Sequence, residues 1–297
     1  MNGLSMWLQS LLYRKLMGKV LPVSWFAQAP PATLSPTPRG EQMQLQIVSH
    51  CWQYAHLLIY QISSLVQHPP QQAHVTYTLY YAEEDLDTAR LVAFFDQQVV
   101  PGITWQWRPL PRAALFRRAI GRNQAALASE ADWVWFTDCD TLFLDSCLDS
   151  LTTLLTGCTE RLVFPASERI TPLLEATDDI LTSVREQPRL TTIDTDEFDH
   201  NDIRKAKGAF QIVHGDVCRA LGYCNGIGLY QQPTDQWRKT FEDSVFRKLL
   251  RTEGKAIDIR GLHRIRHIEK GRYREDSGVN TAVSGLRKGI RRNIDVT

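Results

Sequence analysis

The sequence has no long apolar run and almost no net charge. In 297 residues, 34 Lys and Arg face 33 Asp and Glu, which gives a formal net charge of +1. A protein that binds nucleic acid through bulk electrostatics carries a clear basic excess, so we expect no nucleic-acid partner. No run approaches the roughly 20 apolar residues that span a bilayer. Apolar residues form 43% of the chain, which excludes a disordered protein and is typical of a folded domain.

The sequence also lacks cysteine pairs with the spacing of a metal or redox site. The six cysteines are Cys51, Cys139, Cys147, Cys158, Cys218 and Cys224, and none belongs to a C-x-x-C pair. In a chain of this length, scattered cysteines are typical of reduced, mostly buried thiols. We therefore expect a cytoplasmic protein, and peripheral attachment to the inner membrane surface stays open.

Charge is unevenly distributed along the chain. Residues 194–202 (DTDEFDHND) are acidic, whereas residues 260–274 (RGLHRIRHIEKGRYR) and 287–292 (RKGIRR) are basic. We expect the acidic run to be a mobile loop between two halves of the domain. A basic segment of this kind can contact phosphate groups or anionic lipid, and the last residues can equally form a solvated tail, 276–297.

Two segments precede the main domain. Residues 1–28 begin with leucines at near-helical spacing, interrupted by Arg14, Lys15 and Lys19, which predicts an amphipathic helix. Such a helix can lie on an anionic membrane surface or pack against the domain or a partner. Residues 29–44 contain APPATLSPTPRG, and this composition predicts an extended linker.

From residue 45 the pattern alternates between strands and helices. Strands are predicted at 45–49, 75–81, 103–107 and 133–136, and helices at 55–66, 87–98 and 115–129. This alternation predicts an α/β fold with a doubly wound, mostly parallel sheet over residues 45–275. Sheets of this type bind ligands at the carboxyl ends of their strands.

Two aspartates follow the most apolar strand, WVWF. Asp138 and Asp140 are separated by one residue at the expected carboxyl edge of the sheet. Carboxylate oxygens at such a position suit Mg²⁺ or Mn²⁺, which bridge readily to substrate phosphates. A solvated turn is the alternative, because Asp is common in turns.

The order of the motifs resembles the GT-A glycosyltransferases, in particular family-2-like or galactosyltransferase-like enzymes. The segment GRNQA (121–125) before WVWFTDCDTLF is similar to the ARNxA and D-x-D block of that family. KGAFQIV (207–213) is similar to its acceptor-side strand, and the Glu242-Asp243 pair before a predicted helix is similar to its ED motif. The resemblance implies a smaller acceptor-binding half beside the nucleotide-binding half.

The resemblance implies a metal-dependent transfer of a sugar from a nucleoside-diphosphate donor, with UDP expected, to a hydroxyl of a glycan or glycolipid. The metal would be held by Asp138, Asp140 and His263, and His267 is the alternative histidine. Asp243, or else Glu242, would be the general base in an inverting reaction. N-capping of the helix is the structural alternative for both carboxylates.

Further donor contacts are expected from the same resemblance. The candidates are Arg122, Asn123, Asp138, Ser49, Asp85 and Arg272. Glu83 is the alternative to Asp85 as the contact to the nucleobase of the donor. Arg122 and Asn123 can instead hold the D-x-D strand in place. We expect Arg117 and Arg118 to lie on a solvated helix face.

Two other functions fit parts of this pattern. A nucleotidyltransferase that makes a nucleotide sugar should have a glycine-rich phosphate loop after the first strand, and SHCWQY contains no glycine. A non-catalytic relative that binds glycan as a scaffold should lack the D-x-D or the ED pair, and both are present.

Overall fold

The computed structural model describes residues 3–183, 187–236 and 240–268, with side chains from Leu8 onward. Its main sheet has seven strands in the order β10-β6-β9-β4-β1-β2-β3. The strands are β1 (Met43–Cys51), β2 (Ala73–Tyr81), β3 (Ile103–Pro109), β4 (Trp133–Phe136), β6 (Leu162–Pro165), β9 (Gln211–His214) and β10 (Lys255–Ile257). β9 runs antiparallel to β4 and β6, and the other neighbours pair in parallel. The predicted α/β class with a mostly parallel sheet is confirmed.

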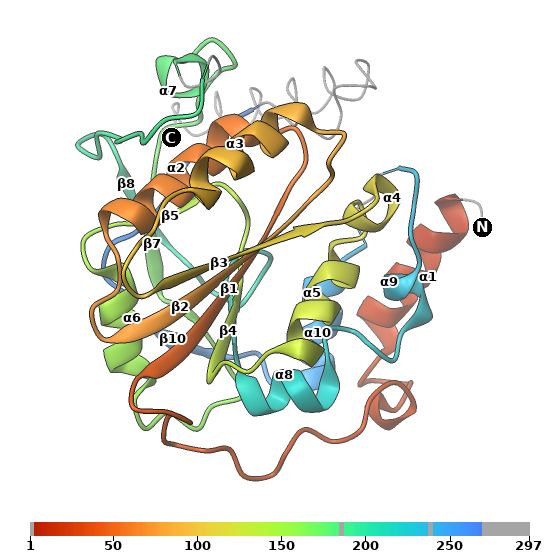
Figure 1. The fold of residues 1–297 in the computed structure, drawn as a ribbon. Coiled ribbons are helices and arrows are strands. Elements are labelled where there is room, and N and C mark those ends of the chain that lie inside the picture. The colour runs from red at the N-terminus through yellow and green to blue at the C-terminus, as the bar shows by residue number, and fades with distance from the viewer. Residues whose placement is uncertain (1–2, 184–186, 237–239, 269–297) are drawn as a thin grey trace, which may run out of the picture.

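Helices cover both faces of this sheet. In Figure 1, α2 (Ala55–Gln67) and α3 (Leu86–Asp96) lie on one side, and α5 (Arg118–Ala128), α8 (Gly215–Leu221) and α10 (Glu242–Leu250) lie on the other. α6 (Cys147–Leu155) and the short helices α4 (Arg112–Leu115), α7 (Asp179–Thr182) and α9 (Gly228–Gln231) complete the described helices of the domain. Every residue of β4 is buried, as expected for a central strand covered on both faces.

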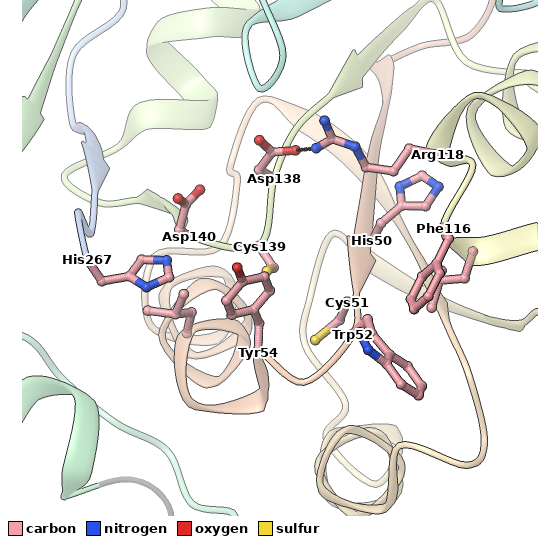
Figure 2. A pocket seen from close by; sticks show the side chains of 12 residues that line it. His50, Cys51, Trp52, Tyr54, Phe116, Arg118, Asp138, Cys139, Asp140 and His267 are labelled. Atoms are coloured by element: carbon pink, nitrogen blue, oxygen red, sulfur yellow. Dashed lines mark hydrogen bonds and ion pairs between the residues drawn. The ribbon is translucent and has the colours of Figure 1, made fainter. Parts of the chain in front are cut away.

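The predicted alternation of elements matches the structure except at one helix. The helix predicted at 115–129 begins later in the structure: Leu115 ends α4, and α5 starts at Arg118 after a break at Phe116 and Arg117. The break turns α5, so Arg117 is 1% exposed and Arg118 points toward the carboxyl edge of the sheet (Figure 2). The prediction of a solvated face for these arginines is therefore wrong.

A second sheet of four short strands lies beside the first. Its order is β5-β11-β7-β8, from β5 (Thr141–Phe143), β11 (Leu262–Arg264), β7 (Ser167–Ile170) and β8 (Asp199–Asp202). The end of the acidic run, residues 199–202, forms β8 instead of the predicted loop, whereas residues 194–198 belong to no helix or strand. Arg264 on β11 makes two hydrogen bonds, of 2.8 and 2.6 Å, to the buried carboxylate of Glu168 on β7. This charge pair holds the two strands together instead of facing a phosphate.

The N-terminal segment is packed against the domain. α1 (Gly3–Leu16) is followed by a short 3₁₀ turn, η1 (Val23–Trp25). Lys248 of α10 donates hydrogen bonds of 2.7 Å to the main-chain carbonyls of Arg14 and Met17. A Cβ added to Gly226 would lie 1.8 Å from the carbonyl oxygen of Phe26. Only glycine permits this contact, so residues 1–28 and the domain form one packed unit over their described part.

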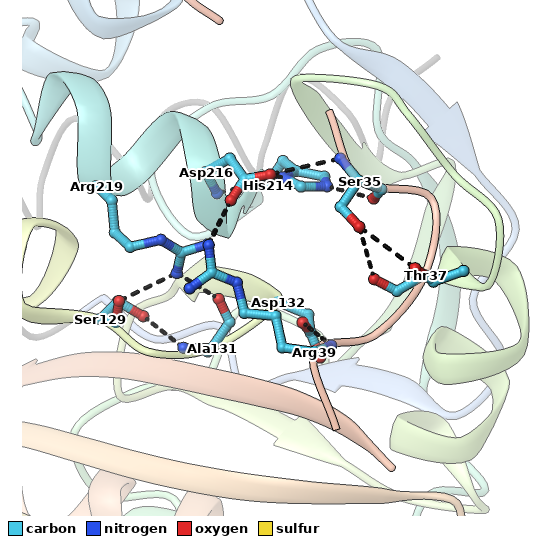
Figure 3. A network of polar contacts seen from close by, with 9 residues as sticks. All are labelled: Ser35, Thr37, Arg39, Ser129, Ala131, Asp132, His214, Asp216 and Arg219. Carbon is cyan, nitrogen blue, oxygen red and sulfur yellow. Dashed lines mark hydrogen bonds and ion pairs between the residues drawn. The ribbon is translucent and has the colours of Figure 1, made fainter. Parts of the chain in front are cut away.

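Residues 29–42, most of the predicted linker, form no helix or strand, and they are held against the domain instead of acting as a free linker. Figure 3 shows the carboxylate of Asp216 accepting hydrogen bonds of 2.7 Å from Arg39 and 2.8 Å from Arg219. Asp132 accepts from the main-chain N–H groups of Arg39 and Gln44, at 2.9 and 2.8 Å. These contacts fix the entry to β1 at the amino edge of the sheet, away from the D-x-D motif.

Asp216→Asn should weaken this attachment. Burial opposes ionisation of Asp216, but hydrogen bonds from Arg219 and Arg39 outweigh it and lower the pKa to about 2. The variant should lose about 1–2 kcal/mol of unfolding free energy at pH 7, measured by urea denaturation.

Because the folded pKa is lowered, the contribution of Asp216 is present above the unfolded pKa of about 4 and is lost as the pH falls toward about 2. The two proteins should therefore converge near pH 2–3. Asp87→Asn, which removes an exposed ion pair with Arg90, is the control and should change stability by less than about 0.5 kcal/mol. An equal effect of both substitutions would contradict the assignment.

Candidate functional site

A pocket lies at the carboxyl edge of the main sheet, where β1 and β4 end. Its empty volume is about 610 Å³, part of it open to solvent. Figure 2 shows side chains from β1, α2, the start of α5 and the segment after β4 meeting there. The lining residues are His50, Cys51, Trp52, Tyr54, Leu57, Leu115, Phe116, Arg118, Asp138, Cys139, Asp140 and His267. Both aspartates of the D-x-D motif therefore reach a single pocket.

Arg118 connects the D-x-D motif to the ED pair. Its guanidinium pairs with the carboxylate of Asp138, and its Nε lies 3.7 Å from Oε1 of Glu242 (Figure 2 shows the first contact). The negative charge of Asp138 raises the pKa of Arg118 above its usual value. Glu242 also accepts a hydrogen bond of 3.1 Å from the hydroxyl of Thr240. Two motifs about 100 residues apart in the sequence thus meet through one arginine.

Arg122 lies one turn farther along α5 and is completely buried. It donates to the main-chain carbonyls of Gly208 and Thr137, at 3.1 and 3.4 Å, and to the hydroxyl of Tyr223, at 3.0 Å. Its guanidinium lies 3.6 Å from Asp138. Arg122 therefore holds the end of the D-x-D strand in place from the buried side, through Thr137 and Asp138. This is one of the two roles predicted for it.

Asp243 lies at the start of α10, close to the same edge. Its carboxylate accepts a hydrogen bond of 3.3 Å from the N–H of Gly208, and a Cβ on that glycine would lie 3.9 Å from the carboxylate of Asp138. Gly208 has a φ of +37°, and the residue belongs to the KGAFQIV segment. The three predicted motifs therefore converge, although Asp243 and Glu242 are not among the pocket-lining residues.

Of the two histidines that the sequence offered as metal ligands, His267 is the one that lines the pocket. His263, which was preferred from the sequence as a metal ligand, lies on β11, where its Nδ1 is 3.1 Å from the carbonyl of Gly261 and its ring packs on Phe198. Burial lowers the pKa of His263. The backbone explains the difference, because β11 pairs with β5 and the chain reaches the pocket only after β11 ends.

The donor chemistry of the pocket fits a divalent cation that binds together with a phosphate ligand. Asp140 and His267 line the pocket together, and carboxylate and imidazole are both ligands for Mn²⁺. Among the described residues, no three His, Cys, Asp or Glu side chains are gathered as a complete metal site. Mg²⁺ and similar ions are commonly held by one or two carboxylates plus substrate phosphates, so an incomplete protein ligand set is sufficient.

His50 at the end of β1 is a pocket residue that the sequence reasoning missed. It is 8% exposed, and within the described residues neither ring nitrogen has a hydrogen-bond partner. Its ring stacks on Tyr80 at 5.1 Å, and a Cβ on Gly121 would lie 2.5 Å from its Nε2. Ser49, the predicted contact, is fully buried and is not a lining residue, because only the last two residues of β1, His50 and Cys51, reach the pocket at the carboxyl end of the strand.

Aromatic side chains form one wall of the pocket. Trp52 packs edge-on against Phe116 at 5.6 Å, and the ring of Tyr54 lies 5.4 Å from that of His267. Trp52 and Tyr54 belong to the segment SHCWQY that follows the first strand, so its aromatic content was the available signal. Flat apolar walls beside a few charged groups are typical of small-molecule sites.

Other predicted donor contacts serve the fold. Asp85 caps α3 and accepts from the N–H of Gln53 and the hydroxyl of Thr88. Asn123 accepts from the N–H of Tyr223 and donates to Asn225, at 2.9 and 3.0 Å. Neither residue lines the pocket, and Arg272 lies outside the described residues.

No protein-family model matches the chain, and no curated protein is significantly similar to it in sequence. Among solved structures, the chain is similar to S. aureus TarS 1–349, with 12% identity over 76% of this chain and a TM-score of 0.45. It spans 58% of the length of that structure. A second match, S. aureus TarS 1–349 in complex with UDP-GlcNAc, has 11% identity over 46% of this chain and 36% of that chain, with a TM-score of 0.32. Likenesses this distant carry no functional argument.

His50 should make the protein sensitive to mild acid. Burial, and then the positive charges of Arg122 and Arg118, lower the pKa of His50 well below 6.5. Below the unfolded pKa of about 6.5, the unfolded chain binds a proton that the folded chain does not, so stability falls as the pH decreases.

His50→Gln should therefore reduce the slope of unfolding free energy against pH between about pH 6.5 and 5 by up to about 1.4 kcal/mol per pH unit. Urea denaturation at several pH values measures that slope. His74→Gln is the control. It changes a histidine on β2 that is hydrogen-bonded to Thr104, and it should leave the slope of unfolding free energy against pH nearly unchanged. Equal slopes for His50→Gln and the wild type would contradict the neutral state of His50.

Proposed function

We propose that the protein is a metal-dependent glycosyltransferase that transfers a sugar from a nucleoside-diphosphate-sugar, preferably a UDP-sugar, to a hydroxyl of a glycan or glycolipid acceptor. The observation that carries this proposal is the convergence of the D-x-D motif, which lines the pocket, with KGAFQIV and the ED pair, which contact Asp138 and its partner arginines beside it. Ligands of doubly wound sheets bind at this edge. The mixed sheet with a small second sheet beside it is consistent with the GT-A architecture.

The charge of the site supports a requirement for a cation. Four carboxylates, from Asp138, Asp140, Glu242 and Asp243, lie near this edge of the sheet. Arg118 and Arg122 pair with them, whereas Arg264, which also acts on Asp138 and Asp140, is already bound to Glu168. A diphosphate entering this environment would add further negative charge. When bound, Mn²⁺ or Mg²⁺ would supply the positive charge that stabilises a diphosphate leaving group.

The protein ligands proposed for the cation are Asp140 and His267, with Asp138 beside them. Asp138 pairs with Arg118 and Arg122, so it acts chiefly as a positioning group in the structure described here. Arg118 is the side chain of the pocket best placed to contact phosphate oxygens, because guanidinium groups suit their geometry. The aromatic wall and His50 remain available for the nucleoside.

Asp243 is the proposed general base, with Glu242 as the alternative. Glu242 contacts Arg118 and Thr240, whereas the described contact of the Asp243 carboxylate is one N–H donor, that of Gly208. A carboxylate that accepts one hydrogen bond keeps lone pairs for a proton of the acceptor hydroxyl. One base without a covalent nucleophile implies inversion at the anomeric carbon, which NMR of the product would establish.

The rival functions make distinct demands on the same pocket. A nucleotidyltransferase needs a phosphate-binding loop after β1, where this chain has bulky aromatic side chains. A scaffold relative needs no catalytic carboxylate. Product analysis distinguishes the three functions, because only a glycosyltransferase releases the nucleoside diphosphate when a nucleotide-sugar donor and an acceptor are combined.

A panel of UDP-, GDP- and dTDP-sugars with Mn²⁺ should identify the donor by thermal stabilisation. At about 100 times its dissociation constant, a ligand adds about 2.7 kcal/mol to stability, which shifts the melting temperature by several degrees. Asp140→Asn should lose the part of the shift that needs Mn²⁺, and Asp87→Asn should keep it. If no donor stabilises the wild type with or without metal, the glycosyltransferase proposal is wrong.

Asp243→Asn should lower kcat by about 100-fold or more, since proton removal by a positioned base contributes that much. Asparagine can still accept from the N–H of Gly208, so the donor-induced thermal shift should stay the same. The measurement is release of nucleoside diphosphate in the presence of acceptor, with Glu242→Gln examined in parallel. Full activity of Asp243→Asn would transfer the role of base to another residue.

A further inference from the structure

The described N-terminal residues expose apolar and basic side chains together. Of the nine large hydrophobic residues that are exposed in the described part of the chain, four lie between residues 8 and 25. They are Leu8, Leu12, Val20 and Trp25, exposed by 47, 51, 69 and 70%. With the exposed Lys15 and Lys19 they form what we call the N-terminal surface. Figure 1 places α1 at the edge of the molecule, beside α9.

The α1 region packs on the domain through one face and leaves two leucines on the opposite face. Ser10 and Met17 are completely buried, and Tyr13 packs on Phe26 with ring centroids 5.5 Å apart. Leu8 and Leu12 lie about half a helical turn away from that buried face. A soluble helix normally buries its leucines and exposes its serines. The exposed leucines therefore require an explanation other than packing against this domain.

The charge pattern indicates what would cover this surface. No Asp or Glu occurs before Glu41, whereas Arg14, Lys15, Lys19 and Arg39 all precede it. Lys15 lies on the same side of α1 as Leu12, one turn away. Within this segment the exposed apolar groups are accompanied by basic and no acidic residues, although the exposed Glu253 lies near Lys248. Apolar and basic groups together complement the headgroups and upper acyl chains of an anionic lipid leaflet. Within the described residues, no helix is long and apolar enough to cross a membrane.

We propose that the N-terminal surface binds the surface of an anionic bilayer, with α1 lying in the plane of the interface. Leu8 and Leu12 insert among the upper acyl chains, and Trp25 lies at headgroup level, where its amphipathic ring is favoured. Lys15 and Lys19 pair with anionic headgroups. A second copy of the chain is less well matched, because two such surfaces would place like charges together. The proposal does not depend on the glycosyltransferase assignment.

Flotation of the full chain with lipid vesicles tests the proposal. One set of vesicles is phosphatidylcholine alone, and the other contains roughly 30% phosphatidylglycerol. The protein should float with the anionic vesicles at low salt and be released at high salt, since the Debye length falls to about 3 Å at 1 M. Leu8→Gln/Leu12→Gln should reduce the partition coefficient by at least about tenfold. Lys15→Gln/Lys19→Gln should reduce it by about tenfold on anionic vesicles only.

A matched control is available in Leu86→Gln/Leu154→Gln, which changes two leucines exposed by 64 and 38% on α3 and α6. This variant should bind vesicles like the wild type, and circular dichroism should show that all variants are folded. Equal binding to neutral and anionic vesicles, or unchanged binding of Leu8→Gln/Leu12→Gln, would overturn the proposal. Concentration-dependent dimers that disappear in Leu8→Gln/Leu12→Gln, without vesicle binding, would assign the surface to a second copy instead.

Discussion

The fully buried guanidinium of Arg122 is the constraint on which the arrangement of the site depends. A buried charge is costly unless it is paired and hydrogen-bonded, so its surroundings must supply acceptors in fixed places. Those acceptors come from three separate parts of the chain, Thr137 at the end of β4, Gly208 before β9, and Tyr223 after α8. Because one guanidinium binds all three acceptors, their relative positions are fixed, and Asp138 lies 3.6 Å from the same guanidinium. This explains why the D-x-D strand and the KGAFQIV segment meet at one edge.

Arg118 extends the same arrangement toward solvent. Because it lies one turn before Arg122 on α5, it faces the same strand end from the pocket side and reaches Glu242 as well. The break between α4 and α5 at Phe116 and Arg117 makes this possible. In a continuous helix over 115–129, the side chain of Arg118 would point in a different direction. A ligand with negative charge would compete with Asp138 and Glu242 for Arg118, so ligand binding and the relative positions of the two motifs are linked. Such linkage suits a site that must assemble around its substrate.

The sequence predicted the fold better than the details of the site. Strands such as WVWF, with continuous apolar residues, can be recognised because both faces of the sheet are covered. Ser49 does not line the pocket, whereas His50 and Cys51 do, because only the last residues of β1 reach the carboxyl edge, and the exact end of a strand is not set by its apolar pattern. His263 does not line the pocket and His267 does, because β11 pairs with strands distant in sequence and the chain reaches the pocket only beyond β11. The second sheet and the contacts of residues 29–44 depend on such long-range pairing, which local patterns do not contain.

The N-terminal helix and the proposed catalytic helix are in direct contact, and this links the two proposals physically. Lys248 of α10 binds the last carbonyls of the α1 region, and the guanidinium of Arg14 lies 4.3 Å from the ring centroid of Phe241. Phe241 immediately precedes Glu242 and Asp243 and has a φ of +55°, a conformation that costs free energy unless its neighbours hold it. An α1 helix anchored on a lipid surface would keep α10 close to that surface. If the acceptor is carried by a membrane lipid, as proposed, this contact would bring the lipid surface toward the helix that begins with Glu242 and Asp243.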